Sequence, residues 1–207
     1  MQNNKNCILR LAKYKKALLR LRSLGFIKVF SENLADAIGV DSSQVRKDFS
    51  LFNITGSKKG GYIITELIEK LNNVLGKGEP EKVIIIGCGN IGSALMKYKG
   101  FQKEDIKIIC GFDNNIEKTN KNNKIPIYPL EDLEQFVKTN EIKTAIIATP
   151  DLVAQQIADM IISCGIKGIL NFAPIHLRVP ENIVVTNVNL EIELETVIYY
   201  VNELWKE

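Results

Sequence analysis

The 207-residue chain is poor in the side chains that metal centres and catalytic triads commonly use. Its single histidine, His176, excludes a multi-histidine metal centre and argues against a histidine-based triad. The four cysteines are widely spaced and form no C-x-x-C motif, which indicates neither a zinc site nor a disulfide framework. We therefore expect no metal cofactor and a chain that works in a reducing compartment.

The sequence also lacks long apolar runs. No stretch approaches the ~18 consecutive apolar residues of a membrane-spanning helix, and the first residues, MQNNK, lack the apolar core of a signal peptide. With 45% hydrophobic and 25% charged residues, the composition is that of a folded globular protein. These features predict a cytoplasmic protein with no membrane partner.

The formal net charge is only +3, but it is unevenly divided along the chain. The segment V-L-G-K-G-E-P has two glycines and a proline between periodic stretches, and it predicts a domain boundary at Lys77–Gly78. Residues 1–77 carry a net charge of +8, whereas residues 78–207 carry −5. Such asymmetry suggests a nucleic-acid-binding or membrane-binding segment fused to a second domain. On charge alone, a solvated basic face on a small domain is the alternative.

The basic half has the layout of a helix-turn-helix. Apolar residues recur at helical spacing from Ile8 to Leu24, a short helix follows Ser31 and closes at Gly39, and a third helix covers about residues 43–51. That third helix would lie in the DNA major groove, with its polar side chains near base edges and phosphates. The DNA-contacting residues predicted on this helix are Ser43, Gln44, Arg46 and Lys47. A small helical adaptor without a DNA role is the alternative.

A basic, glycine-rich segment follows the third helix. Residues 53–61 (NITGSKKGG) lie between Phe52 and a short apolar run, which predicts a hairpin wing. Lys58 and Lys59 would reach the DNA backbone or the minor groove. Thr65 is expected to cap a fourth, amphipathic helix.

The acidic half begins with the pattern of a dinucleotide-binding fold. Residues 82–86 (KVIII) predict a strand buried on both faces, and G-C-G-N-I-G follows directly, before a helical segment. In that context Gly87 makes the tight turn, Gly89 lets the backbone approach a pyrophosphate, and Gly92 permits close helix–strand packing. The free N–H groups of the helix N-terminus attract the phosphates. The loop residues predicted to contact the cofactor are Gly87, Cys88, Gly89, Asn90, Ile91 and Gly92.

An acidic residue ends the next predicted strand. Asp113 lies 21 residues after Gly92, close to the ~20 expected for the carboxylate that binds an adenosine ribose through its hydroxyls. Its negative charge would repel a 2′-phosphate, which favours NAD(H) over NADP(H). A surface loop aspartate is the alternative. Cys88 could be a redox-sensitive thiol, since a helix N-terminus lowers a thiol pKa, but a small side chain filling the loop is the preferred interpretation.

Further βα units complete a doubly wound parallel sheet in residues 78–187. Strands are predicted at 125–128, 144–148 and 166–170, and helices at 130–138 and 151–164. In such sheets the ligand crevice lies beyond the carboxyl ends of the strands. The strand tips predicted to line the nicotinamide side are Thr149, Pro150, Asn171, Phe172, Ala173 and Pro174.

The last segment, residues 188–207, predicts one helix with an apolar stripe that must cover its own domain or a partner subunit. A homodimer would supply the twofold symmetry that helix-turn-helix proteins match to palindromic sites in double-stranded DNA.

Three motifs together carry a resemblance to a known family. Q-V-R-K-D at residues 44–48, G-C-G-N-I-G at 87–92 and G-I-L-N-F-A-P at 168–174 resemble the Rex redox-sensing transcriptional repressors of bacteria, over essentially the whole chain. The resemblance implies a winged-helix N-domain, a Rossmann core that binds NADH or NAD+, and a C-terminal helix swapped between the subunits of a homodimer. It also implies that NADH releases the repressor from its operator. Tyr98, in Y-K-G-F, resembles a family tyrosine near the nicotinamide pocket.

This chain departs from the family pattern at three places. Lys99 replaces a proline after Tyr98, and the wing, G-S-K-K-G-G-Y, has lost one basic residue and displaced another. Asn189 stands where the family usually has an aspartate, and Lys16 where it has the arginine that can pair with that aspartate. The resemblance implies that the residues at 16 and 189 form a charged contact that couples cofactor state to DNA-binding geometry, and Lys16 and Asn189 change that contact.

The function expected is that of a homodimeric repressor that binds operator DNA and responds to the NADH/NAD+ ratio. One alternative is a small NAD-dependent oxidoreductase, but the sequence leaves no room for a substrate domain and contains no Tyr-x-x-x-Lys. The chain is therefore not expected to be an enzyme. The other alternative is a Rex-like protein that binds NAD(H) but has altered or lost its DNA contact.

Overall fold

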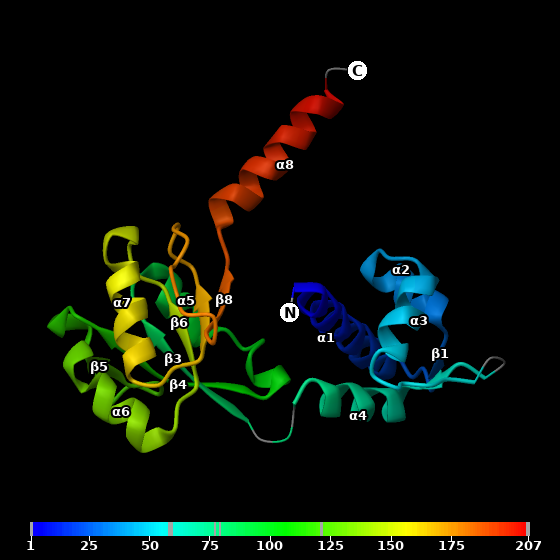
Figure 1. Cartoon of the computed structure of the whole chain (residues 1–207), viewed down its shortest axis with the longest axis horizontal. Coiled ribbons are helices and arrows are strands. Elements are labelled where there is room, and N and C mark those ends of the chain that lie inside the picture. The colour runs from blue at the N-terminus through cyan, green and yellow to red at the C-terminus, as the bar shows by residue number, and fades with distance from the viewer. Residues whose placement is uncertain (1, 58–59, 77, 79, 121, 206–207) are drawn as a thin grey trace. The chain divides into compact units, whose positions relative to one another are not determined.

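A computed structural model describes residues 2–57, 60–76, 78, 80–120 and 122–205 of the chain (Figure 1). The chain forms two compact units, Met1–Glu79 and Pro80–Glu207. Each unit has a hydrophobic core of its own.

The first unit is mainly helical. Its elements are α1 (Gln2–Ser23), β1 (Lys28–Val29), α2 (Ser31–Ile38), α3 (Ser42–Ser50), β2 (Tyr62–Ile63) and α4 (Ile64–Val74). The two short strands pair antiparallel, and a further bridge joins Ser57 to Gly61 at the base of the predicted wing. Leu11, Leu18 and Phe49 are fully buried where α1 and α3 contribute to one core. The arrangement is a helix-turn-helix followed by a hairpin.

Local sequence explains most of the boundaries in this unit. Gly39 ends α2 with a φ of 72°, a left-handed conformation that glycine adopts without strain. Two expected caps are wrong by one residue or two. Ser31 is the first residue of α2, and the N-cap position is held by Phe30, whose N–H donates to the Asn33 side chain. Helix α4 begins at Ile64, so Thr65 lies inside that helix.

The second unit is an α/β fold around a six-stranded parallel sheet. The strands are β3 (Glu81–Ile86), β4 (Ile106–Asp113), β5 (Ile127–Pro129), β6 (Thr144–Ile147), β7 (Gly168–Asn171) and β8 (Val184–Asn187). Their order across the sheet is β5-β4-β3-β6-β7-β8. Counted within the unit this is 3-2-1-4-5-6, the order of a dinucleotide-binding Rossmann sheet. The order reverses between β3 and β6, which is where such folds hold their ligands.

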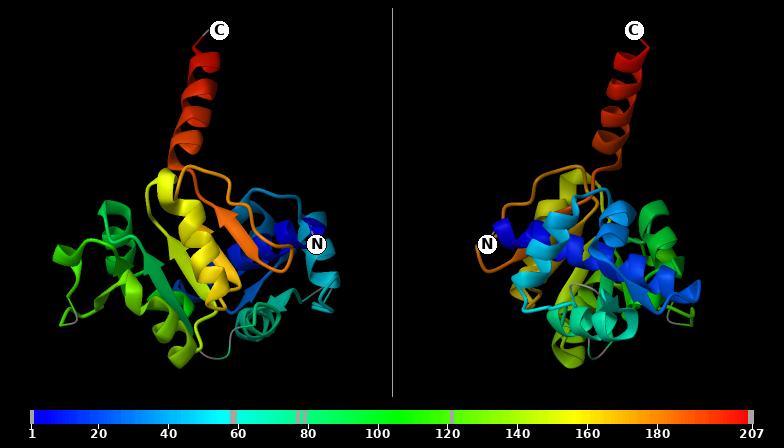
Figure 2. Two further views of the ribbon diagram at one scale, coloured as in Figure 1. Left: turned by 60° about the vertical axis from the view of Figure 1, so that its left-hand side comes forward. Right: turned by 90° about the vertical axis from the view of Figure 1, so that its right-hand side faces the viewer.

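Helices cover both faces of this sheet (Figure 2). Alternate residues of β3 show the two layers: Ile84 and Ile86 belong to the larger core, which also contains residues of α6 (Leu133–Asn140) and α7 (Asp151–Ser163). Ile85 belongs to a smaller core against which Leu95 and Met96 of α5 (Asn90–Lys97) pack. Burial on both faces explains why the strand is an uninterrupted apolar run.

Of the last two elements, β8 (Val184–Asn187) was not predicted from the sequence, whereas helix α8 was. Strand β8 was not anticipated, because three of its four residues are exposed and only Val185 is partly buried. Helix α8 (Leu190–Leu204) is formed as expected, and the Asn189 side chain caps it by accepting from the N–H groups of Glu191 and Ile192. Every residue of α8 is exposed in the single chain. Within the described residues, no helix combines the length and the apolar character that crossing a membrane requires.

Candidate functional site

A cavity of about 820 Å³ lies at the point where the strand order reverses. Its volume falls within the roughly 300–1,000 Å³ usual for small-molecule sites. It is bounded by the ends of β3, β4 and β6 and by the loops that follow them. The lining residues are Ile86, Gly87, Gly89, Asn90, Ile91, Phe112, Asp113, Asn114, Lys118, Leu130, Ala148, Thr149, Pro150, Val153, Gln156, Ile157, Met160, Phe172 and Pro174.

The glycine loop forms one wall of this cavity, and its glycines are needed for distinct reasons. Gly87 has a φ of +93°, and a Cβ there would lie 2.6 Å from the Ala148 carbonyl oxygen. A Cβ on Gly92 would overlap the Gly87 carbonyl oxygen, so this glycine lets α5 pack against the strand end. A Cβ on Gly89 would meet nothing within 4 Å, which leaves open space beside the first turn of α5. The unbonded N–H groups of that turn make the loop a cradle for phosphate.

Asp113 closes the end of the cavity where the adenosine ribose is expected. Its side chain is 6% exposed. One carboxylate oxygen, Oδ2, accepts from the Cys88 N–H at 2.8 Å and lies 3.3 Å from Lys118 Nζ, and the other accepts from the Asn115 N–H at 2.9 Å. The carboxylate is therefore fixed in position and reaches the cavity as a hydrogen-bond acceptor, which suits ribose hydroxyls.

The other end of the cavity is largely apolar. Phe172 and Pro174 line it together with Thr149 and Pro150. The Thr149 hydroxyl oxygen is buried and has no hydrogen-bond partner among the described residues. Buried polar atoms are nearly always satisfied in folded proteins, so this hydroxyl is a natural contact for a bound ligand. The residues present thus fit a dinucleotide: a phosphate cradle, a ribose carboxylate and an apolar end with one orphaned hydroxyl.

The structure does not bring five of the predicted cofactor residues to the lining of this cavity. Gly92 serves packing, as described above, and Ala173 is buried. Asn171 is fully buried, and its side chain bonds Ala173, the Ile175 carbonyl and Asn187, so it shapes the loop after β7. Tyr98 is 58% exposed and packs edge-on against Phe101.

Cys88, the fifth of these residues, turns its side chain into the protein. Its thiol lies 3.7 Å from the Phe112 carbonyl oxygen, and only its backbone N–H reaches Asp113. Burial, with the Asp113 charge as a second cause, raises the pKa of the Cys88 thiol to about 11. The thiol is therefore protonated near neutral pH, which argues against a reactive redox cysteine.

Sequence reasoning missed several residues that line the cavity, among them Lys118 and Gln156. Lys118 follows Asp113 by five residues and ends a three-residue 3₁₀ helix (Ile116–Lys118), which is too short for a periodic sequence pattern to mark that position. A helical-wheel treatment of α7 could have placed Val153, Gln156, Ile157 and Met160 on one face, because they recur at three- and four-residue spacing.

In the first unit, the exposed surface of α3 carries the polar residues expected to meet DNA. Ser43, Arg46 and Lys47 are exposed. Arg46 lies 3.4 Å from Glu32, but both side chains are more than half exposed, so the contact is weak and easily exchanged for another. Lys58 and Lys59, the predicted wing contacts, lie outside the described residues.

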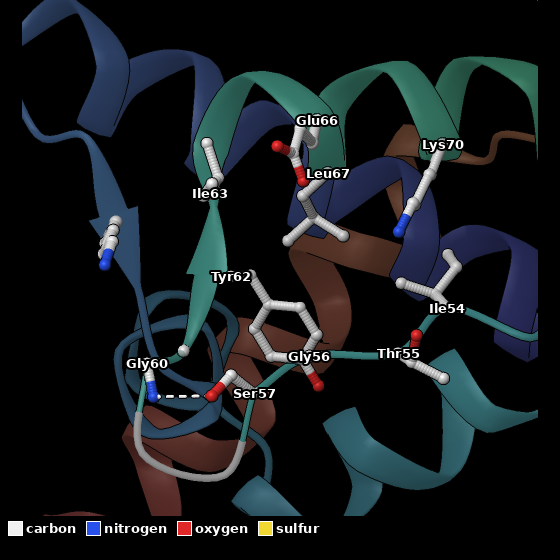
Figure 3. A pocket seen from close by; sticks show the side chains of 12 residues that line it. Ile54, Thr55, Gly56, Ser57, Gly60, Tyr62, Ile63, Glu66, Leu67 and Lys70 are labelled. Atoms are coloured by element: carbon white, nitrogen blue, oxygen red, sulfur yellow. Dashed lines mark hydrogen bonds between the residues drawn. The ribbon is translucent and has the colours of Figure 1, made fainter.

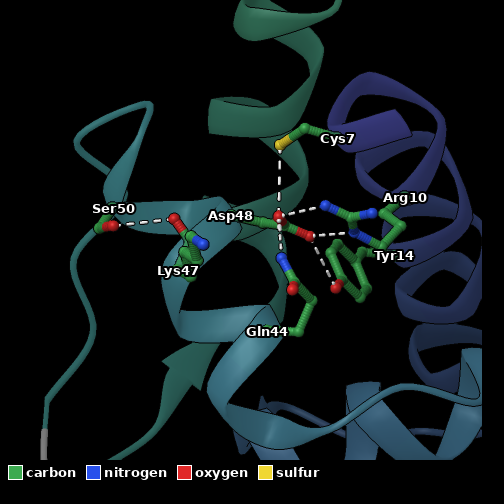
Figure 4. A network of polar contacts seen from close by, with 7 residues as sticks. All are labelled: Cys7, Arg10, Tyr14, Gln44, Lys47, Asp48 and Ser50. Atoms are coloured by element: carbon green, nitrogen blue, oxygen red, sulfur yellow. Dashed lines mark hydrogen bonds and ion pairs between the residues drawn. The ribbon is translucent and has the colours of Figure 1, made fainter. Parts of the chain in front are cut away.

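Gln44 behaves differently from its neighbours, because it belongs to a network centred on Asp48 (Figure 4). Asp48 is fully buried and accepts from Arg10 of α1 at 2.6 and 2.7 Å, from the Tyr14 hydroxyl at 3.0 Å and from the Gln44 amide at 2.7 Å. The Cys7 thiol lies 3.4 Å from the same carboxylate. Asp48 thus ties α3 to α1 and holds the Gln44 amide, which was expected to be free for a base edge.

A smaller hollow of about 310 Å³ lies between α4 and the hairpin of the first unit (Figure 3). Tyr62 and Leu67 line it together with the charged residues Lys28, Glu66 and Lys70. Its lining residues offer neither the phosphate cradle nor the orphaned hydroxyl of the larger cavity. We therefore assign no ligand to it.

Two family models match the chain in separate regions. Residues 5–50 match "Putative DNA-binding protein N-terminus", which covers most of α1 and all of α2 and α3. Residues 78–175 match "CoA binding domain", which covers the nucleotide fold from β3 to the loop after β7.

Curated relatives match over nearly the full length. The redox-sensing transcriptional repressor Rex of Streptococcus equi subsp. equi (strain 4047) is 38% identical over 197 residues, which is 94% of this chain and 92% of the relative. The protein of the same name from Streptococcus pyogenes serotype M1 is 37% identical over the same shares.

Solved structures agree with these relatives. RSP, described as a Rex-family repressor, has been crystallised with β-NAD+ and operator DNA, and that chain is 34% identical with a TM-score of 0.89, covering 98% of this chain and 94% of the other. The structure of RSP with β-NADH is 35% identical with a TM-score of 0.84, covering 97% and 96%.

Proposed function

The chain belongs to the Rex family of redox-sensing transcriptional repressors, and we propose that it represses transcription by binding operator DNA as a homodimer that NADH releases. NADH and NAD+ are its cofactors, and it acts by binding and not as an oxidoreductase. Because its ligands are operator DNA and the nicotinamide pool, we place it in the cytoplasm.

The observation that carries this proposal is the cavity at the switch point of the sheet. It combines the glycine cradle beside α5, the fixed Asp113 carboxylate and the orphaned Thr149 hydroxyl in one hollow. We propose that the pyrophosphate lies on the loop from Gly87 to Ile91, that the adenosine ribose lies at Asp113, and that the nicotinamide lies toward Phe172. We propose that Asn171 and Cys88 support this site from behind, because their side chains bond the Ile175 and Phe112 carbonyl groups.

The apolar end of the cavity offers a reason for redox sensitivity. The nicotinamide ring is neutral when reduced and cationic when oxidised, and burying a cation beside Phe172 and Pro174 without a counter-charge is costly. The site should therefore favour NADH. A ligand shifts a conformational equilibrium only when it binds the two states differently, so NADH must favour a subunit arrangement that does not fit the operator.

The DNA-binding half rests on α3. We propose that Ser43, Arg46 and Lys47 face the major groove, with Lys58 and Lys59 of the wing near the backbone. Two copies of α3 must then reach half-sites ~34 Å apart or a multiple of it. The exposed apolar side chains of α8 supply the surface on which a second subunit would dock.

Operator binding titrated against both nicotinamides tests the function directly. We expect a purified sample to retard operator DNA without cofactor or with NAD+, and to lose that complex as NADH is added. A gel-shift titration at fixed salt measures both midpoints. Equal operator affinity at saturating NADH and NAD+ would refute redox sensing.

Arg46→Ala tests whether α3 reads bases. Arg46 is exposed on α3 and its ion pair with Glu32 is weak, so its guanidinium is available for a base edge. We expect the specific operator complex to weaken by about 1–3 kcal/mol, with binding to random DNA much less affected. Fluorescence anisotropy with operator and scrambled duplexes measures the difference, and Glu32→Gln controls for loss of the ion pair.

Operator binding measured at several salt concentrations tests the alternative of a Rex-like protein that has lost its DNA contact. The altered wing and the engagement of Gln44 by Asp48 favour that alternative. A repressor that contacts several phosphates should show a steep fall of affinity with salt, whereas a protein without the contact should show no specific complex at all.

A further inference from the structure

An ion pair stands at the ribose end of the cofactor cavity. Lys118 Nζ lies 3.3 Å from Asp113 Oδ2, and both residues line the cavity beside Asn114. The two partners differ in exposure: the Lys118 side chain is 42% exposed and the Asp113 side chain only 6%. The lysine therefore occupies the mouth of the cavity while the carboxylate lies inside it.

Asp113 does not depend on Lys118 for its position. The N–H groups of Cys88 and Asn115 donate to its two carboxylate oxygens at 2.8 and 2.9 Å. Lys118, in contrast, is the last residue of a short 3₁₀ helix (Ile116–Lys118), and its long, flexible side chain can leave the carboxylate without unfolding anything around it. The pair thus consists of a fixed anion and a movable cation.

The charges of this pair act in opposite directions on the two dinucleotides. A fixed carboxylate accepts hydrogen bonds from the 2′- and 3′-hydroxyls of NAD(H) and repels the 2′-phosphate of NADP(H), which carries about −1.5 to −2 charges near neutral pH. An ammonium group within 3.3 Å of that carboxylate offsets part of the repulsion and can itself bind phosphate oxygens. The discrimination between the two cofactors therefore depends on both residues.

We propose that Lys118 is a specificity-determining residue of the cofactor site. Paired with Asp113, it limits the preference for NAD(H) over NADP(H); released from Asp113, it provides the anion contact for a 2′-phosphate. The inference rests on the proposed dinucleotide function and adds a residue to it. On this proposal, removal of the Asp113 carboxylate alone would let the site accept NADP(H).

A four-protein comparison tests the proposal: wild type, Lys118→Met, Asp113→Asn and the double variant. The intrinsic fluorescence of NADH and NADPH on the full chain gives a dissociation constant for each. Asparagine removes the charge and keeps an acceptor oxygen for one of the two loop N–H groups, and methionine keeps the length of the lysine stem. Lys143→Met, an exposed lysine directly before β6 at the opposite end of the sheet, is the matched control. Thermal melts check that each variant is folded.

We expect Asp113→Asn to lower the ratio of the NADPH to the NADH dissociation constant by about 10-fold or more, in line with the worth of a charged hydrogen bond. Lys118→Met should raise that ratio, and the double variant should lose most of the change made by Asp113→Asn. The operator complex of Asp113→Asn should then dissociate with NADPH.

A double variant that behaves like Asp113→Asn would overturn the proposal, because Lys118 would then contribute nothing to phosphate binding. An unchanged ratio in Asp113→Asn would overturn it as well. Failure of the wild type to bind either dinucleotide would instead refute the proposed cofactor function, so the two failures are distinguishable.

Discussion

Asp48→Ala should destabilise the first unit by about 3–5 kcal/mol and abolish operator binding at moderate temperature. The substitution leaves the Arg10 guanidinium, the Tyr14 hydroxyl and the Gln44 amide without their shared acceptor, and Tyr14 is fully buried. It also unties α3 from α1, so the surface that meets DNA loses its fixed orientation. Circular-dichroism melts and operator anisotropy measure the two effects.

Asp36→Ala, on the exposed surface of α2, is the matched control and should change stability little. If Asp48→Ala melted at the same temperature as the wild type, that result would contradict the stabilising role assigned to the network centred on Asp48.

The same carboxylate predicts a pH dependence. Burial disfavours the charged form of Asp48, but the hydrogen bonds from Arg10 and Gln44 outweigh it and hold the pKa of this carboxyl below its usual value. A group with a lowered pKa in the folded state stabilises the fold above its unfolded pKa of about 4 and loses that contribution as the pH falls further. The wild type should therefore lose stability below about pH 4, and Asp48→Ala should lack this component.

Gly92→Ala should reduce NADH affinity by at least about 100-fold, equivalent to roughly 2.7 kcal/mol. The added Cβ would overlap the Gly87 carbonyl oxygen, and relief of that overlap must move either α5 or the glycine loop. Both form the phosphate cradle, so the cofactor loses its main anion contact while the DNA-binding unit is untouched. The variant should bind operator and no longer respond to NADH.

Gly168→Ala controls for the effect of adding a methyl group. At the start of β7 a Cβ would meet Thr144 at 3.4 Å, an ordinary contact distance. Titration of NADH by fluorescence and of the operator complex by gel shift compares the two variants. Release of Gly92→Ala from DNA at the wild-type NADH concentration would show that the loop tolerates the methyl group.

The fold was largely predictable because its signals are local and periodic. The apolar run of β3, the glycine motif after it and the left-handed Gly39 between two short helices each fix a backbone conformation through neighbouring residues. Strand β8 was not predicted because its pairing with β7 is a long-range contact and three of its four residues are exposed. Nothing in its four residues distinguishes it from an extended loop.

The site was predictable only where backbone shape determines it. The glycines and Asp113 follow from the motif and its spacing, and the structure brings Asp113, Thr149 and Phe172 to one cavity. Side-chain direction is a different matter, because it depends on partners far along the chain. Gln44 turns to Asp48, Cys88 turns inward toward Phe112, and Lys118 reaches Asp113 from a 3₁₀ helix too short to show a periodic pattern.

The exposure of α8 in the single chain links function to protein concentration. Its apolar side chains include Leu194, Ile198 and Leu204, each at least half exposed, and association of two chains would remove them from water. Association is a second-order process, so the share of chains competent for a two-part operator rises with the total amount of protein. Such a repressor responds to its own abundance as well as to NADH, and a cell that makes less of it would weaken repression more than in proportion.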